Sequence, residues 1–112
     1  SSPVLLFDEG GVLVFFNEAA EVLLGRTYDE SGSMSRAQWM AAFRMESVTT
    51  GLDISGPDTP LAKAIDNVEP AQRNVVLRGM DGVRRQVTVT AVPIKGVGPG
   101  TAGFMAWLSH SA

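Results

Sequence analysis

The chain has 112 residues, a formal net charge of −3 and no cysteine. This length supports one domain with one hydrophobic core. Without cysteine there is no disulfide framework and no thiolate ligand, which is compatible with the cytosol, and we expect a cytoplasmic domain. A mildly acidic chain without a Lys/Arg cluster argues against nucleic-acid binding. No apolar run approaches the roughly 20 residues of a membrane helix, so we expect no membrane contact.

The first 25 residues predict a hairpin followed by a short helix. Residues 4–7 and 12–16 are apolar and β-prone, and an acidic turn with two glycines lies between them. Glycines supply the positive φ angles that such a turn needs. Asn17 is a good N-cap for a helix over residues 18–24, and Gly25 would end that helix.

The middle of the chain predicts two more helices. Ser35 is a candidate N-cap for residues 36–44, where Trp39, Met40 and Phe43 share one face. Residues 45–57 carry no firm pattern. Thr59 followed by Pro60 is a strong helix start, and this helix would run to about residue 67.

The last third predicts three strands. The Asp81-Gly82 turn joins two β-prone arms within residues 75–92, and the second arm alternates cleanly between apolar and polar positions. A Gly/Pro loop over residues 93–100 leads to residues 101–108, which are apolar on both faces, as in an inner strand. The whole pattern predicts an α+β fold: five antiparallel strands with the helices on one face.

These pieces together resemble the PAS sensory domain family over nearly the whole chain. The resemblance lies in residues 7–25 (FDEGGVLVFFNEAAEVLLG), residues 59–65 (TPLAKAI) and residues 79–94 (GMDGVRRQVTVTAVPI). It implies a sheet in the order 2-1-5-4-3, with the helices clasping one face. It also implies that residues 1–112 are a single PAS domain excised from a longer signalling protein with a covalently linked effector domain. The end reads Leu108-Ser109-His110 where many relatives carry an Asp-Ile-Thr-like coupling motif.

The resemblance also implies two apolar surfaces on the sheet. One would line a small-molecule cavity under the helices, and the other would face outward as a homodimer interface. The predicted cavity wall comprises Leu5, Phe7, Trp39, Phe43, Leu61, Ile65, Val75, Leu77, Val87, Val89, Ala91, Met105 and Trp107. The predicted interface comprises Val76, Thr88, Thr90, Val92, Phe104, Ala106 and Leu108.

Catalysis and the common cofactors find little support in the residues. His110 is the only histidine and lies in the last three positions, where we expect a solvated tail. A cavity-facing histidine for haem is therefore missing, and LOV-type flavin chemistry lacks its cysteine. No His/Asp/Glu cluster has metal-ligand spacing. Nothing pairs a nucleophile with a base, so we expect no enzyme.

The sequence therefore predicts a sensory or regulatory module of a protein such as a histidine kinase, a cyclase or a phosphatase regulator. A small organic ligand would fill the apolar cavity, and Arg36 and Arg44 either reach an anionic group at its mouth or are solvated. Two alternatives remain open: a ligand-free dimerisation module with a filled core, and a small α+β enzyme such as an isomerase, which the missing catalytic constellation disfavours.

Overall fold

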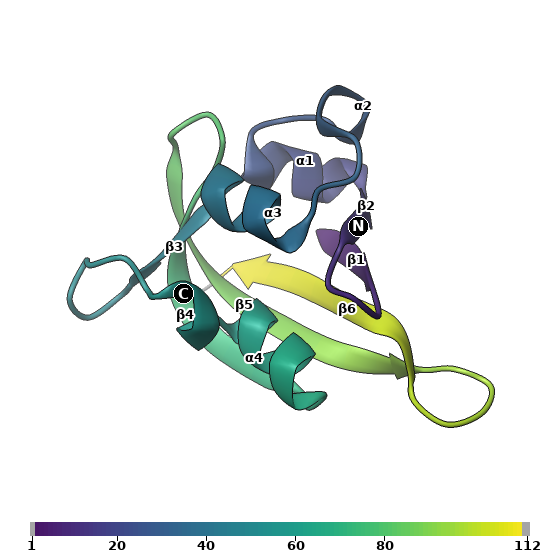
Figure 1. The fold of residues 1–112 in the computed structure, drawn as a ribbon. Helices are drawn as coiled ribbons and strands as arrows, with labels where there is room; N and C mark the ends of the chain where they lie inside the picture. The colour runs from purple at the N-terminus through teal and green to yellow at the C-terminus, as the bar shows by residue number, and fades with distance from the viewer. Residues whose placement is uncertain (1, 111–112) are drawn as a thin grey trace.

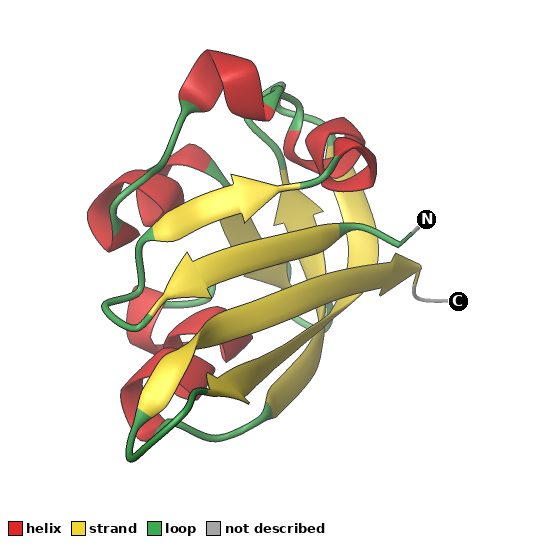
Figure 2. Ribbon diagram, turned by 90° about the vertical axis from the view of Figure 1, so that its right-hand side faces the viewer, coloured by secondary structure: helices red, strands yellow, loops and turns green. Residues whose placement is uncertain are grey.

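The computed structural model describes residues 2–110. Its one sheet has six antiparallel strands in the order β2-β1-β6-β5-β4-β3. The sheet is curled, and the helices lie on one side of it (Figures 1 and 2). The elements are β1 (Val4–Asp8), β2 (Leu13–Phe16), α1 (Glu18–Leu24), α2 (Tyr28–Ser31), α3 (Arg36–Ala42), β3 (Arg44–Ser47), a 3-10 helix η1 (Gly56–Asp58), α4 (Pro60–Asn67), β4 (Ala71–Arg78), β5 (Arg84–Lys95) and β6 (Thr101–His110).

The α+β class and the antiparallel sheet with helices are as predicted, but the prediction of five strands was wrong. The additional strand, β3, pairs with β4 at the edge of the sheet, with Met45 opposite Leu77. Its outer edge is covered by the following loop, where the Ile54 N–H donates to the carbonyl of Met45 at 2.8 Å. Only four residues long, this strand buries Met45 between two charged neighbours, so its sequence carries little β signal.

The helix starts follow from side-chain caps. Asn17, Ser35 and Thr59 each accept a hydrogen bond from a backbone N–H in the first turn of α1, α3 and α4, as the sequence predicts. The short helix α2 lies between the first two predicted helices, in a polar segment that contains Gly and Ser. It begins with a reciprocal capping box between Thr27 and Glu30, a signature that is readable in the sequence.

The last strand corrects the assignment of its two faces. Phe104, Ala106 and Leu108 are 2%, 0% and 3% exposed and face the core under the helices. They were predicted for the outer interface. Met105 and Trp107 were predicted for the cavity wall, but they are only partly buried and lie on the opposite face.

The register between β5 and β6 explains this inversion. Residues directly opposite each other in an antiparallel pair share a face, and Leu108 lies opposite Val89, a core residue of β5. A bulge shifts the register between Ile94 and Lys95, and a shift of one residue moves every later side chain to the other face. Because β6 is apolar on both sides, its own sequence does not determine which of its residues face the core.

The ends of the last two strands also differ from prediction. β5 continues through Pro93 to Lys95, so the connecting loop is limited to residues 96–100. Proline is tolerated at position 93 because β4 does not extend that far along β5. The first residue of β4, Ala71, pairs with Ala91. His110 is the last residue of β6, opposite Val87, and not part of a tail beyond the strand.

The corrected assignment of the two faces of β6 predicts unequal losses of stability when neighbouring side chains are shortened to alanine. Phe104→Ala removes a buried ring and should lower the free energy of unfolding by about 3–5 kcal/mol. Met105→Ala removes a partly exposed side chain on the other face and should cost less than about 1.5 kcal/mol in a monomer. Urea unfolding of both variants in dilute solution measures the difference, and equal losses would contradict the assigned phase.

Candidate functional site

The space expected between the helices and the middle of the sheet is filled by side chains. Most residues of the predicted cavity wall form a continuous hydrophobic core with exposures of 3% or less: Leu5, Phe7, Trp39, Phe43, Leu61, Val75, Leu77, Val87, Val89 and Ala91. Ile65 is partly buried and packs against them. These side chains are packed closely over the centre of the sheet, as is usual in protein interiors.

Trp39 fixes the position of α3 over this core. Its indole N–H donates to the main-chain carbonyl of Gly11 at 2.9 Å, in a buried bond between α3 and the turn that joins β1 to β2. The indole ring meets Phe7 edge-on at 5.4 Å and lies nearly parallel to Phe43 at 6.0 Å. The three aromatic side chains thus pack together between α3 and the first hairpin.

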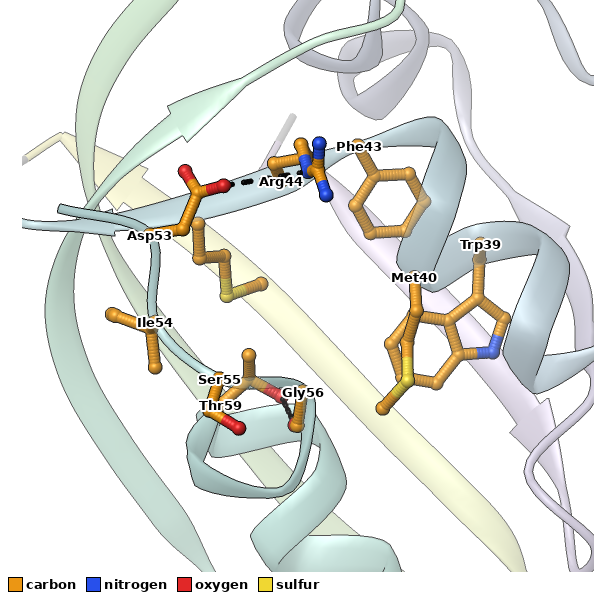
Figure 3. Close-up of a pocket in the computed structure, with 10 residues that line it drawn as sticks. Trp39, Met40, Phe43, Arg44, Asp53, Ile54, Ser55, Gly56 and Thr59 are labelled. Carbon is orange, nitrogen blue, oxygen red and sulfur yellow. Dashed lines mark hydrogen bonds and ion pairs between the residues drawn. The ribbon is translucent and has the colours of Figure 1, made fainter.

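A cavity of about 220 Å³ remains at the C-terminal end of α3, between β3 and the segment that leads into α4 (Figure 3). Trp39, Phe43 and Met45, at most 5% exposed, form its floor. The residues around it are Trp39, Met40, Phe43, Arg44, Met45, Asp53, Ile54, Ser55, Gly56 and Thr59. Of the predicted wall, only Trp39 and Phe43 take part.

The rim of this cavity carries opposite charges. The side chains of Arg44 and Asp53 are 54% and 52% exposed, and Arg44 Nε lies 3.7 Å from Asp53 Oδ2. The sequence suggested Arg44 as a residue at a pocket mouth. It gave no indication of residues 53–56, because this loop lacks periodicity and joins the cavity only through its pairing with β3.

Four larger hollows lie elsewhere on the described surface. Of the two largest, one, of about 480 Å³, lies beside α1 and both described chain ends, and the other, of about 540 Å³, lies beside the 96–100 loop. The second is surrounded only by exposed and half-buried residues. Neither has the combination of aromatic floor and charged rim that distinguishes the cavity at α3.

An ion pair joins the two helices that flank the cavity, at the far end of α3. Arg36 at the start of α3 forms a bidentate bridge to Asp66 near the end of α4, with contacts of 2.5 and 2.9 Å. Hydrogen bonding to Arg36 lowers the pKa of the Asp66 carboxyl, partial desolvation opposes this, and the Coulomb attraction adds to it. Arg36 is therefore a helix-to-helix contact remote from the cavity, whereas Arg44 borders the cavity.

Comparison with solved structures identifies this architecture. The PAS domain of the fruit-fly ELK potassium channel superposes with a TM-score of 0.73 at 15% identity, covering 97% of this chain and 85% of that one. The chain has the PAS fold. The light-state dimer of the fungal blue-light photoreceptor Vivid gives a TM-score of 0.72 at 18% identity, covering 97% of this chain and 77% of that chain.

A third PAS relative is part of a kinase. The LOV domain of a blue-light activated histidine kinase from Erythrobacter litoralis gives a TM-score of 0.68 at 17% identity, covering 96% of this chain and 93% of that chain. No protein-family model and no curated protein sequence matches this chain. The relation to these PAS domains is thus one of fold, with little sequence in common.

Within residues 2–110, no group of three or more His, Cys, Asp or Glu side chains is placed to hold a metal ion. The same residues include no helix that is both long and apolar enough to cross a membrane.

The sheet face opposite the helices is the second apolar surface of the domain. Leu6 of β1 lies between Phe15 of β2 and Met105 of β6, and Trp107 lies between Val4 and Thr90. Of the predicted interface, the outward residues are Val76, Thr88, Thr90 and Val92, and the structure adds Val4, Leu6, Phe15, Met105 and Trp107 to this outer face. Phe104, Ala106 and Leu108 do not belong to it.

The bridge between α3 and α4 predicts a lowered titration midpoint for Asp66. The folded-state pKa lies below the ordinary value of 3.8. The pairing therefore stabilises the fold above pH 3.8, and this contribution is lost as the pH falls through the lowered folded value. Because Asp66 is 45% exposed, the stabilisation is at most about 1 kcal/mol.

Carboxyl carbon NMR across pH 2–6 measures this midpoint. We expect it below 3.8 in the original chain and close to 3.8 in Arg36→Gln. A midpoint at or above 3.8 in the original chain would contradict the bridge. Glu30 provides an internal control, because its pKa is lowered by hydrogen bonds from Thr27 and should not respond to Arg36→Gln.

Proposed function

We propose that this PAS domain is a sensory module that takes up a small organic molecule in the cavity between α3 and residues 53–56. The observation that carries the proposal is a pocket with an aromatic and thioether floor and a polar rim, which is the usual composition of a small-molecule site. The methionines at the pocket, Met40 and Met45, are flexible side chains that adapt to an occupant.

The pocket size favours a small ligand. A volume of 220 Å³ is below the roughly 300–1,000 Å³ of sites for drug-sized molecules. A haem or a flavin would need rearrangement of the core residues around Trp39. A ligand of metabolite size would instead favour one spacing of α3 and residues 53–56 over another, which is how binding shifts a conformational equilibrium.

We also propose that the outer face of the sheet forms a homodimer or contacts a linked effector domain. Aromatic and aliphatic side chains on this face, including Phe15 at 43% exposure, support an interface. Vivid, a protein of the same fold, forms a dimer in its light state, which supports the dimer part of the proposal. A linked histidine kinase, as in the Erythrobacter protein, is one effector that the fold accommodates. The effector and the cytoplasmic location stay predictions.

Blocking the pocket tests the sensory role. A side chain at Gly56 would enter the cavity, since a Cβ built there lies 3.3 Å from the Met40 sulfur, and its backbone does not need a positive φ. We expect small molecules that raise the melting temperature of the original chain to lose that effect in Gly56→Leu. Gly10→Leu is the matched control, because Gly10 is exposed and its Cβ would meet only Asp8.

Native mass spectrometry and a thermal-shift screen of a metabolite library provide the readout for these variants. If no compound shifts the melting temperature of the original chain and its mass shows no retained molecule, ligand sensing is contradicted. The ligand-free dimerisation module would then be the better reading.

A charge on the outer face tests the interface. Trp107→Glu should convert a dimer into a monomer in light scattering, because a carboxylate buried in an apolar interface is unpaired. Val97→Glu, in the fully exposed loop, should leave the mass unchanged. A folded Trp107→Glu variant with the mass of the original dimer would refute the proposed interface.

A further inference from the structure

The charged pair at the pocket rim is held loosely. The distance of 3.7 Å between Arg44 Nε and Asp53 Oδ2 is beyond hydrogen-bond range. The bridge between Arg36 and Asp66, by contrast, makes two hydrogen bonds. An exposed pair of this kind contributes little to stability, so a ligand that separates the two partners loses little.

These two side chains are the only charged ones among the residues around the pocket. The floor beneath them is apolar, with Trp39 and Phe43 on one side (Figure 3), and the buried Met45 also lines the pocket. The volume of 220 Å³ corresponds to about seven water molecules at ~30 Å³ each. An occupant is therefore small, apolar at one end, and charged or strongly polar at the other.

The opposite charges of Arg44 and Asp53 restrict which charged groups the polar end of the ligand can carry. A ligand with a single carboxylate would bind the Arg44 guanidinium but would place its charge beside the Asp53 carboxylate. A ligand with a single ammonium would meet the reverse conflict with Arg44. A ligand that carries both charges on neighbouring atoms gives each rim residue an opposite partner, and discrimination of this kind rests on repulsion as much as attraction.

We propose that the pocket binds a free α-amino acid with an apolar side chain. The carboxylate pairs with Arg44 and the ammonium with Asp53, while the side chain lies against Met45 and the aromatic floor. Free amino acids with flexible or branched apolar side chains, such as methionine and leucine, match the size of the pocket and its thioether and aromatic surroundings. The inference rests on the proposed sensory function of the same pocket and names its ligand class.

Calorimetry with blocked analogues tests the two charges separately. L-Methionine should bind, whereas N-acetyl-L-methionine, which lacks the ammonium, and L-methioninamide, which lacks the carboxylate, should each bind at least about tenfold more weakly, equivalent to 1.4 kcal/mol. Equal affinity for L-methionine and either analogue would overturn the proposal.

Variants assign each charge to its partner. In Asp53→Asn, the difference between L-methionine and its N-acetyl form should disappear while the difference from the amide persists. Arg44→Gln should give the reverse pattern. Arg73→Gln is the matched control, because Arg73 is exposed on β4 and does not border the pocket, and it should change neither difference.

The outcomes separate this inference from the sensory function itself. If amino acids do not bind but other small molecules do, and Gly56→Leu abolishes their binding, the amino-acid assignment is wrong and the sensory pocket stands. If neither amino acids nor library compounds bind, both proposals are wrong.

Discussion

The hydrogen bond from the Trp39 indole to the Gly11 carbonyl is the contact on which the arrangement of the helices depends. It is buried and joins α3 to the first hairpin, across 28 positions of the chain. Losing it would leave a buried polar group unpaired, at a cost of about 1–3 kcal/mol. With the indole held there, Phe7 and Phe43 pack around it, and the middle of the sheet is filled. Next to Trp39 and Phe43, a cavity remains past the end of α3.

The sheet then separates two apolar surfaces by the alternation of its strands. Side chains of β5 point in turn to the core and to the outer face, and β6 follows the same alternation through its register with β5. The helices and the pocket are on one side, and Met105 and Trp107 are on the other. If the proposed sensory function holds, a signal from pocket occupancy would reach the outer face through the sheet, because neighbouring residues of one strand contact both sides.

Much of the fold could be predicted because local chemistry determines it. Asn17, Ser35 and Thr59 cap helices with their own side chains, and the Asp81-Gly82 turn joins two strands whose alternation is explicit. The helices are expected on one side of the sheet because β5 has a single apolar face that must be covered. These features are encoded within a few residues of each other, so sequence alone specifies them.

What the sequence did not reveal depends on contacts between distant segments. β3 exists because its partner β4 lies more than 25 positions later, and its own four residues are half charged. A register shift near Lys95 determines which residues of β6 face the core, and no local sequence pattern predicts this shift. The cavity at α3 results from how completely Trp39 and its neighbours fill the core. The alternation of apolar and polar residues in the sequence does not predict packing of that kind.

The two tryptophans of the chain report separately on the two surfaces, because Trp39 lies at the pocket and Trp107 on the outer face. The indole N–H signals in a proton–nitrogen NMR spectrum, recorded during addition of L-methionine and again during dilution, therefore test the central claim that these surfaces are distinct. We expect the amino acid to shift the Trp39 signal first and dilution to shift that of Trp107. A ligand that moves only the Trp107 signal would contradict the account.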